Sequence, residues 1–90
     1  MINFRKYTSD TNRIELLEEI YNYLNEDLIG LTLKCGDYSF HVDPYGFGSA
    51  TIWINEEQIA DFATIDEFFL KFIIDGKPLI EQIDKLEYDF

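Results

Sequence analysis

Hydrophobic and polar residues alternate along two neighbouring stretches near the middle of the chain, residues 31–35 and 38–43. Such alternation is typical of β-strands with one buried face, because successive side chains point to opposite sides of a strand. Only a Gly-Asp pair separates the stretches, and Gly readily adopts the positive φ of a two-residue hairpin turn. This turn predicts a register in which Leu33 lies opposite Phe40 on an apolar face. Four further apolar residues share that face: Leu31, Cys35, Tyr38 and Val42.

Two later stretches extend this hairpin into an antiparallel meander. Residues 49–55 alternate again, and the register predicts that Trp53 lies opposite His41 on the outer side. The core side of this strand holds three apolar residues: Ala50, Ile52 and Ile54.

Residues 58–62 are a weaker candidate for a fourth strand. Pairing Ile59 with Ile54 on the core side would turn Asp61 inward and Phe62 outward. An inward charge is tolerable on an edge strand, where it discourages pairing with another sheet. We therefore expect three or four strands in the meander.

Helical periodicity flanks the meander on both sides. Apolar residues recur every three or four positions from a start near Asp10 or Asn12 to Leu28, so they form one stripe on a helix. Thr64 and Glu67 match a capping box, in which a hydroxyl and a carboxylate bond to the free amides at a helix start. We therefore predict one helix before the meander and another directly after it.

The last part of the chain predicts a third helix, because Gly76 suits a helix end and Pro78 suits the first turn of the next helix. Together these patterns predict a single α+β domain over residues 1–90. It has an N-terminal helix, a three- to four-stranded antiparallel β-meander and two C-terminal helices packed on one face of the sheet. Seven residues of the first and second helices are expected to pack on that face: Ile14, Leu17, Tyr21, Leu24, Phe68, Phe69 and Phe72.

Acidic residues dominate the charge, since 18 Asp and Glu face 7 Lys and Arg and give a formal net charge of −11. The excess is spread along the chain and is not confined to a tail. Such a field repels nucleic acid and anionic membranes, and it attracts basic proteins. A simpler interpretation is that the acidity only aids solubility.

The single cysteine, Cys35, cannot form an internal disulfide and lies on the predicted core face, which favours a reduced, cytoplasmic protein. No run approaches the roughly 20 apolar residues that span a bilayer. The first residues also lack the long apolar stretch of a signal peptide. We therefore expect a cytoplasmic protein that does not bind membranes.

Catalytic and metal-binding chemistry is sparse. The only imidazole, His41, lies on the opposite side of the predicted hairpin from Cys35, so the two cannot form a Cys-His pair. A zinc site needs three or four ligands, and His41 with Asp43 would need a further carboxylate such as Asp37. The Gly-Phe-Gly of residues 46–48 lacks the strand-to-helix setting of a phosphate loop. We therefore predict a protein that is not an enzyme and that has no metal or cofactor.

The outer face of the meander is where the sequence suggests a function, because a polar surface with an aromatic centre is typical of protein recognition. Three interpretations of Trp53 are open: it contacts a partner, it is covered within the monomer, or it lies in a homodimer contact. Tyr45 and Phe47 either insert into a partner or fold back over the sheet edge. The predicted binding residues are Lys34, His41, Asp43, Tyr45, Phe47, Thr51, Trp53 and Asn55.

The leading interpretation is a small acidic intracellular module that binds another protein with basic character. In architecture and charge the chain is similar in kind to immunity proteins that neutralise basic nuclease toxins, and to phage-encoded mimics of DNA charge. This similarity implies an inhibitor, although the chain carries no family-specific motif. The alternative is a structural or accessory protein that forms a homodimer through the open sheet face. A third interpretation is a domain that binds a small ligand or a metal.

Overall fold

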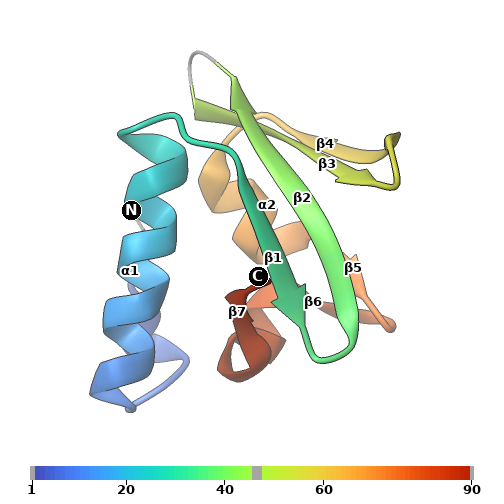
Figure 1. Cartoon of the computed structure of the whole chain (residues 1–90). Coiled ribbons are helices and arrows are strands. Elements are labelled where there is room, and N and C mark those ends of the chain that lie inside the picture. The colour runs from blue at the N-terminus through green and yellow to red at the C-terminus, as the bar shows by residue number, and fades with distance from the viewer. Residues whose placement is uncertain (1, 46–47, 90) are drawn as a thin grey trace.

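The computed structural model describes residues 2–45 and 48–89 of the 90-residue chain. It has the predicted α+β character, with an N-terminal helix before an antiparallel sheet (Figure 1). The elements in chain order, with η for a 3-10 helix, are η1 (Phe4–Lys6), α1 (Thr11–Asn25), β1 (Leu31–Cys35), β2 (Tyr38–Tyr45), β3 (Ser49–Ile54), β4 (Glu57–Phe62), α2 (Ile65–Lys71), β5 (Ile73–Ile74), β6 (Lys77–Pro78), η3 (Leu79–Lys85) and β7 (Leu86–Tyr88).

The main sheet has five strands in the order β4-β3-β2-β1-β7, and all neighbours are antiparallel. The predicted register of the first hairpin is confirmed, since Leu33 pairs with Phe40 and Cys35 pairs with Tyr38. Gly36 takes a φ of 64°, which a residue with a Cβ would adopt only with strain. This turn therefore sets which side chains of β1 and β2 enter the core.

The fifth strand was not predicted. Residues 86–88 form β7, in which Leu86 pairs with Cys35 and Tyr88 pairs with Leu33. The main-chain N–H of Asp89 continues the ladder by donating to the Thr32 carbonyl at 3.1 Å. The guanidinium of Arg13 donates to the Leu86 carbonyl, so α1 also holds this strand. The acidic, aromatic end of the chain thus forms one edge of the sheet.

The predicted register of the fourth strand is wrong. A β-bulge shifts the pairing, so that Ile52 faces Ala60 while Trp53 faces Gln58, and Ile59 is left without a cross-strand partner. Because the bulge adds one residue, it reverses which side chains point inward. Ile59 is therefore exposed, while Phe62 packs against the core.

Helix α1 begins one residue after Asp10, whose carboxylate accepts from the N–H groups of Asn12 and Arg13. The helix ends at Asn25, earlier than the apolar stripe predicts, and Leu28 is 49% exposed. The predicted start of α2 is confirmed, because the Thr64 hydroxyl accepts from the N–H of Glu67 at 3.0 Å.

The segment after α2 differs from the predicted helix end. Asp75 and Gly76 both have positive φ and form the turn of the small β5–β6 hairpin. The predicted third helix is a 3-10 helix that is interrupted at Gln82. The buried amide of Gln82 donates to the carbonyls of Ile74 (2.7 Å) and Lys77 (3.0 Å). These bonds tie η3 to the hairpin and hold the kink in place.

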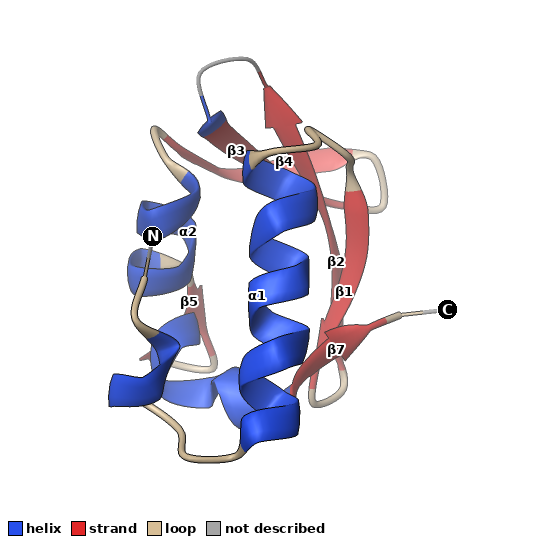
Figure 2. Ribbon diagram, turned by 90° about the vertical axis from the view of Figure 1, so that its left-hand side faces the viewer, coloured by secondary structure: helices blue, strands red, loops and turns tan. Residues whose placement is uncertain are grey.

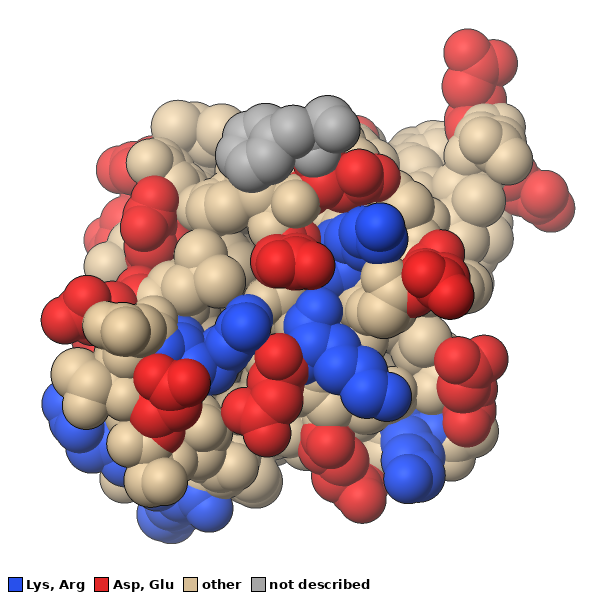
Figure 3. All heavy atoms as spheres, turned by 60° about the horizontal axis from the view of Figure 1, so that its bottom comes forward, with Lys and Arg blue, Asp and Glu red and all other residues tan. Residues whose placement is uncertain are grey.

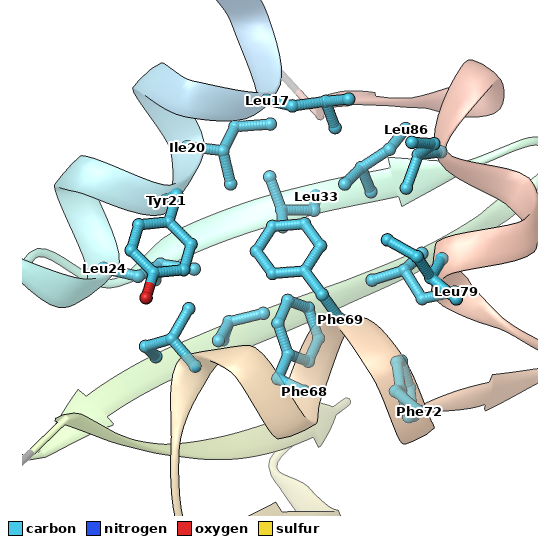
Figure 4. Packing of buried hydrophobic residues seen from close by; sticks show 14 of the residues in the cluster. Leu17, Ile20, Tyr21, Leu24, Leu33, Phe68, Phe69, Phe72, Leu79 and Leu86 are labelled. Atoms are coloured by element: carbon cyan, nitrogen blue, oxygen red, sulfur yellow. The ribbon is translucent and has the colours of Figure 1, made fainter. Parts of the chain in front are cut away.

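The core lies between the sheet and two helices that cover the same face, as predicted (Figure 2). Figure 4 shows residues of α1, Phe68 and Phe69 of α2 and Leu33 of the sheet pointing toward one another. Phe4 packs edge-to-face on Phe69 with ring centroids 5.2 Å apart, so the N-terminal segment packs on the core instead of forming a strand. All seven residues of the predicted helix contact are buried: Ile14, Leu17, Tyr21, Leu24, Phe68, Phe69 and Phe72.

Candidate functional site

The outer face of the sheet is the face opposite the two helices (Figure 2). Its centre is the pair of His41 and Trp53, which lie directly opposite each other on β2 and β3, as predicted. A shallow hollow of about 210 Å³ lies beside this pair and is also lined by Thr32, Ser39 and Asn55. We take this outer face as the candidate binding site.

His41 is held at both ring nitrogens. Its Nε2 lies 2.8 Å from Oδ1 of Asp43, and its Nδ1 lies 3.0 Å from the hydroxyl oxygen of Thr32. Because a carboxylate can only accept, Nε2 carries the proton and donates to Asp43. In the neutral ring, Nδ1 then accepts from the Thr32 hydroxyl. The imidazole is therefore oriented along the face, and its side chain remains 40% exposed.

Gly30 makes room for this pair. A Cβ at position 30 would lie 2.8 Å from Oδ1 of Asp43 and 3.1 Å from Nε2 of His41. Both contacts are closer than ordinary van der Waals distance, so a larger residue would displace the bonded side chains. The loop after α1 thus contributes to the position of His41.

Trp53 is half-buried, which places it between the alternatives of full exposure and full cover. Its indole Nε1 is buried and has no acceptor among the described residues. The accessible part of the ring is consequently carbon, because the N–H faces the covered side. A partner at this site would meet an apolar surface surrounded by polar side chains.

Thr51 does not belong to the accessible site, although the sequence placed it there. Its cross-strand neighbours are Asp43 on β2 and Asp61 on β4, and it is only 5% exposed. Its hydroxyl donates to Oδ1 of Asp61 at 3.1 Å. Thr51 is covered because it lies between the longer side chains of Asp43 and Asp61. Its hydrogen bond orients the Asp61 carboxylate.

The other predicted site residues lie in different surroundings. Lys34 is half-buried and faces Ser39, whereas Asn55 is exposed in the β3–β4 turn. Tyr45 at the end of β2 is 51% exposed and is therefore accessible to a partner. Phe47 lies outside the described residues. The structure therefore gathers His41, Asp43, Trp53 and Asn55 along one face.

Cys35 and His41 lie on opposite faces of the sheet. The Cys35 thiol is buried at 4% exposure and donates to the Gln82 carbonyl at 3.8 Å. Burial raises the pKa of this thiol, so it favours the neutral, unreactive form. Across residues 2–45 and 48–89, no three His, Cys, Asp or Glu side chains gather in a metal-binding arrangement.

The charges are arranged unevenly over the surface. No Lys or Arg occurs between residues 35 and 70, which supply β2, β3, β4 and most of α2, although this range contains seven Asp and Glu. Figure 3 shows Lys and Arg gathered, with acidic side chains between them, on the face that is at the bottom of Figure 1. The strands β2, β3 and β4 therefore contribute carboxylates to the surface but no Lys or Arg of their own.

Sequence reasoning missed a second surface, formed by α1 and the edge strand β7. Tyr88 lies there with its hydroxyl 3.4 Å from Oε1 of Glu19, and it donates to that carboxylate. Burial and the neighbouring Glu19 raise the pKa of Tyr88 to about 12. The alternation of Leu86, Glu87, Tyr88 and Asp89 was the available signal for a strand, but the run is short.

None of the described helices combines the length and the apolarity needed to cross a membrane. Comparison of the chain with protein-family models, with curated proteins and with solved structures gave no match.

Proposed function

We propose that this protein is a small acidic module that binds a basic protein partner, as an inhibitor, an immunity-type protein or a mimic of DNA charge. The binding surface in this proposal is the outer sheet face around His41 and Trp53. The buried, neutral thiol of Cys35 fits a protein that acts in the cytoplasm.

One observation supports this proposal best: the outer face combines an apolar ring surface with carboxylates that have no Lys or Arg nearby in sequence. Asp43 is held by His41 and Asp61 is held by Thr51, so both carboxylates are fixed in position. Fixed charges lose little side-chain freedom when a partner binds.

The two parts of the face would act at different stages of binding. The net charge of −11 would speed the encounter with a basic protein, and this effect would weaken as salt increases. Trp53 would then pack against an apolar side chain of the partner, as tryptophan does at the centre of many interfaces. Charge would thus set the rate of association, and the aromatic contact would set the lifetime.

A test compares two variants that carry the same change in charge. Gln58→Arg places a cation beside Trp53, its cross-strand neighbour, whereas Leu70→Arg places one on the exposed side of α2. Each variant is used to capture proteins from an extract of the source cells at low and at high salt. We expect a basic protein that the wild type and Leu70→Arg retain, and that Gln58→Arg binds about tenfold more weakly. Equal retention by both variants would place the contact elsewhere.

The homodimer alternative uses the same face. Light scattering at increasing protein concentration distinguishes it from binding of a basic partner. Two copies that each carry −11 repel one another, which opposes self-association. A dimer that persists in the wild type and is lost in Gln58→Arg would favour the homodimer over the basic partner.

A further inference from the structure

A groove runs between α1 and the edge of the sheet formed by β1 and β7. Its first hollow has a volume of about 460 Å³ and is lined by Tyr23, Ile29, Leu31 and Tyr88, together with Glu19 and Asp89. A second hollow of about 410 Å³ continues along α1 and shares Glu19 and Tyr23 with the first. The two hollows therefore form one surface feature.

The first hollow is aromatic and apolar. The rings of Tyr23 and Tyr88 meet edge-to-face, with centroids 6.4 Å apart and an interplanar angle of 69°. Ile29 is 46% exposed beside them, because the chain leaves the helix at Asn25 and turns back toward β1. Tyrosine faces attract cations as well as apolar groups.

The second hollow is acidic. Its carboxylates come from Glu15, Glu18, Glu19 and Asp27, and no Lys or Arg occurs between residues 14 and 33. None of these four carboxylates forms an ion pair with a Lys or Arg in the described part of the chain. The groove therefore places an apolar hollow directly beside negative charge that the protein itself does not neutralise.

We propose that this groove is a docking site for a basic amphipathic segment of a partner protein. An apolar side chain of the segment fills the hollow at Tyr23 and Tyr88, and neighbouring Lys or Arg side chains face the carboxylates of α1. Charge complementarity identifies this occupant, because an acidic peptide, a nucleic acid or an anionic lipid would meet like charge.

This inference rests on the proposed function in one respect, the basic character of the partner. It adds a second contact region, and Thr32 connects the two, because Thr32 lines both this groove and the hollow beside Trp53. One partner could therefore contact the groove and the outer sheet face together.

The test is a titration of the isotope-labelled protein, followed by NMR, with a short peptide in which arginine and leucine alternate. We expect the amide signals of Tyr23, Ile29, Thr32 and Tyr88 to shift most. The control peptide carries citrulline in place of arginine, so it keeps the shape and loses the charge. It should bind about tenfold more weakly.

Two double variants that each remove two negative charges separate a groove from a general charge effect. Glu15→Gln with Glu18→Gln changes the groove, whereas Asp37→Asn with Asp75→Asn changes two turns at the other end of β1. We expect the first pair to weaken peptide binding about tenfold and the second to change it by less than about twofold. Equal weakening by both pairs, or tight binding of the citrulline peptide, would overturn the proposal.

The outcome also separates this inference from the proposed function. If the peptide binds in the groove but no partner is captured, the groove proposal is supported and the proposed function is contradicted. If a captured partner depends on the Trp53 face and the peptide causes no specific shifts in the groove, the proposed function is supported and the groove proposal is contradicted.

Discussion

The hydroxyl of Tyr21 donates a hydrogen bond to Oδ1 of Asp66 at 2.5 Å and so joins the middle of α1 to the first turn of α2. Tyr21 is buried, and its ring stacks on Phe69 with centroids 6.2 Å apart. Both helices cover the same face of the sheet, and this bond links them. The opposite face of the sheet carries the candidate binding site.

Replacing Tyr21 with Phe removes this bond and keeps the ring. A hydrogen bond to a charged group contributes about 1.5–3 kcal/mol, so we expect Tyr21→Phe to lower the free energy of unfolding by about that amount. Urea denaturation measures the change. Tyr23→Phe is the control and should change the stability by less than about 0.5 kcal/mol. Equal losses in the two variants would contradict a special role for the Tyr21–Asp66 bond.

Alkaline pH should destabilise the protein through Tyr88. Its pKa is about 12 in the folded protein against an ordinary value of 10.0, so the unfolded chain loses this proton first. The unfolded state then binds fewer protons than the folded state, and stability falls as pH rises from 10.0 toward about 12. Tyr88→Phe should make this decline shallower in denaturation curves recorded across that range. An unchanged slope would show that Tyr88 does not contribute.

The buried N–H of the Trp53 indole is uncommon, because it has no acceptor among the described residues. An unbonded buried donor costs about 1–3 kcal/mol, so Trp53→Phe removes an unfavourable group together with part of the ring. We expect Trp53→Phe to change the unfolding free energy by less than about 1 kcal/mol, and Trp53→Ala to lower it by about 2–4 kcal/mol. A large loss in Trp53→Phe would mean that the N–H is bonded.

The bulge in β4 is tested by two neighbouring apolar residues. Phe62 packs on Phe68 and Phe72, with ring centroids 6.3 and 6.0 Å apart, whereas Ile59 is 40% exposed. We expect Phe62→Ala to cost about 2–4 kcal/mol and Ile59→Ala to cost less than about 1 kcal/mol. Thermal and chemical unfolding measure both. If Ile59→Ala costs more than Phe62→Ala, the data would instead support the register in which Ile59 pairs with Ile54 on the core side.

The turn between β3 and β4 should be easy to stabilise. Asn55 and Glu56 have φ values of 49° and 68°, a pair typical of a type I′ turn, in which Gly is favoured second. We expect Glu56→Gly to raise the unfolding free energy by about 0.5–1 kcal/mol, because Gly relieves the left-handed strain. Glu57→Gly, one residue later and within β4, should instead lower it by about the same amount. If both variants lower the unfolding free energy, Glu56 is not strained by its positive φ.

The predictable part of the candidate site was the part that depends on neighbours in sequence. The pairing of His41 with Trp53 followed from alternation carried across two hairpins. The bonds of His41 to Thr32 and Asp43 were not predictable, because they depend on side-chain rotation within one face. The groove at Tyr23 and Tyr88 was missed entirely, because it forms between α1 and β7, which lie far apart in the sequence.

By itself the sequence determined the first hairpin, its two faces and the apolar faces of both helices, because turn geometry and residue spacing act over a few positions. Only the tertiary structure decided that residues 86–88 add a strand beside β1 and that a bulge reverses β4. Such choices depend on which partners remain unpaired once the core has formed. The strand β7 borders the groove, and the bulge in β4 lies beside Trp53, so the tertiary structure created the groove and completed the outer face that alternation had predicted.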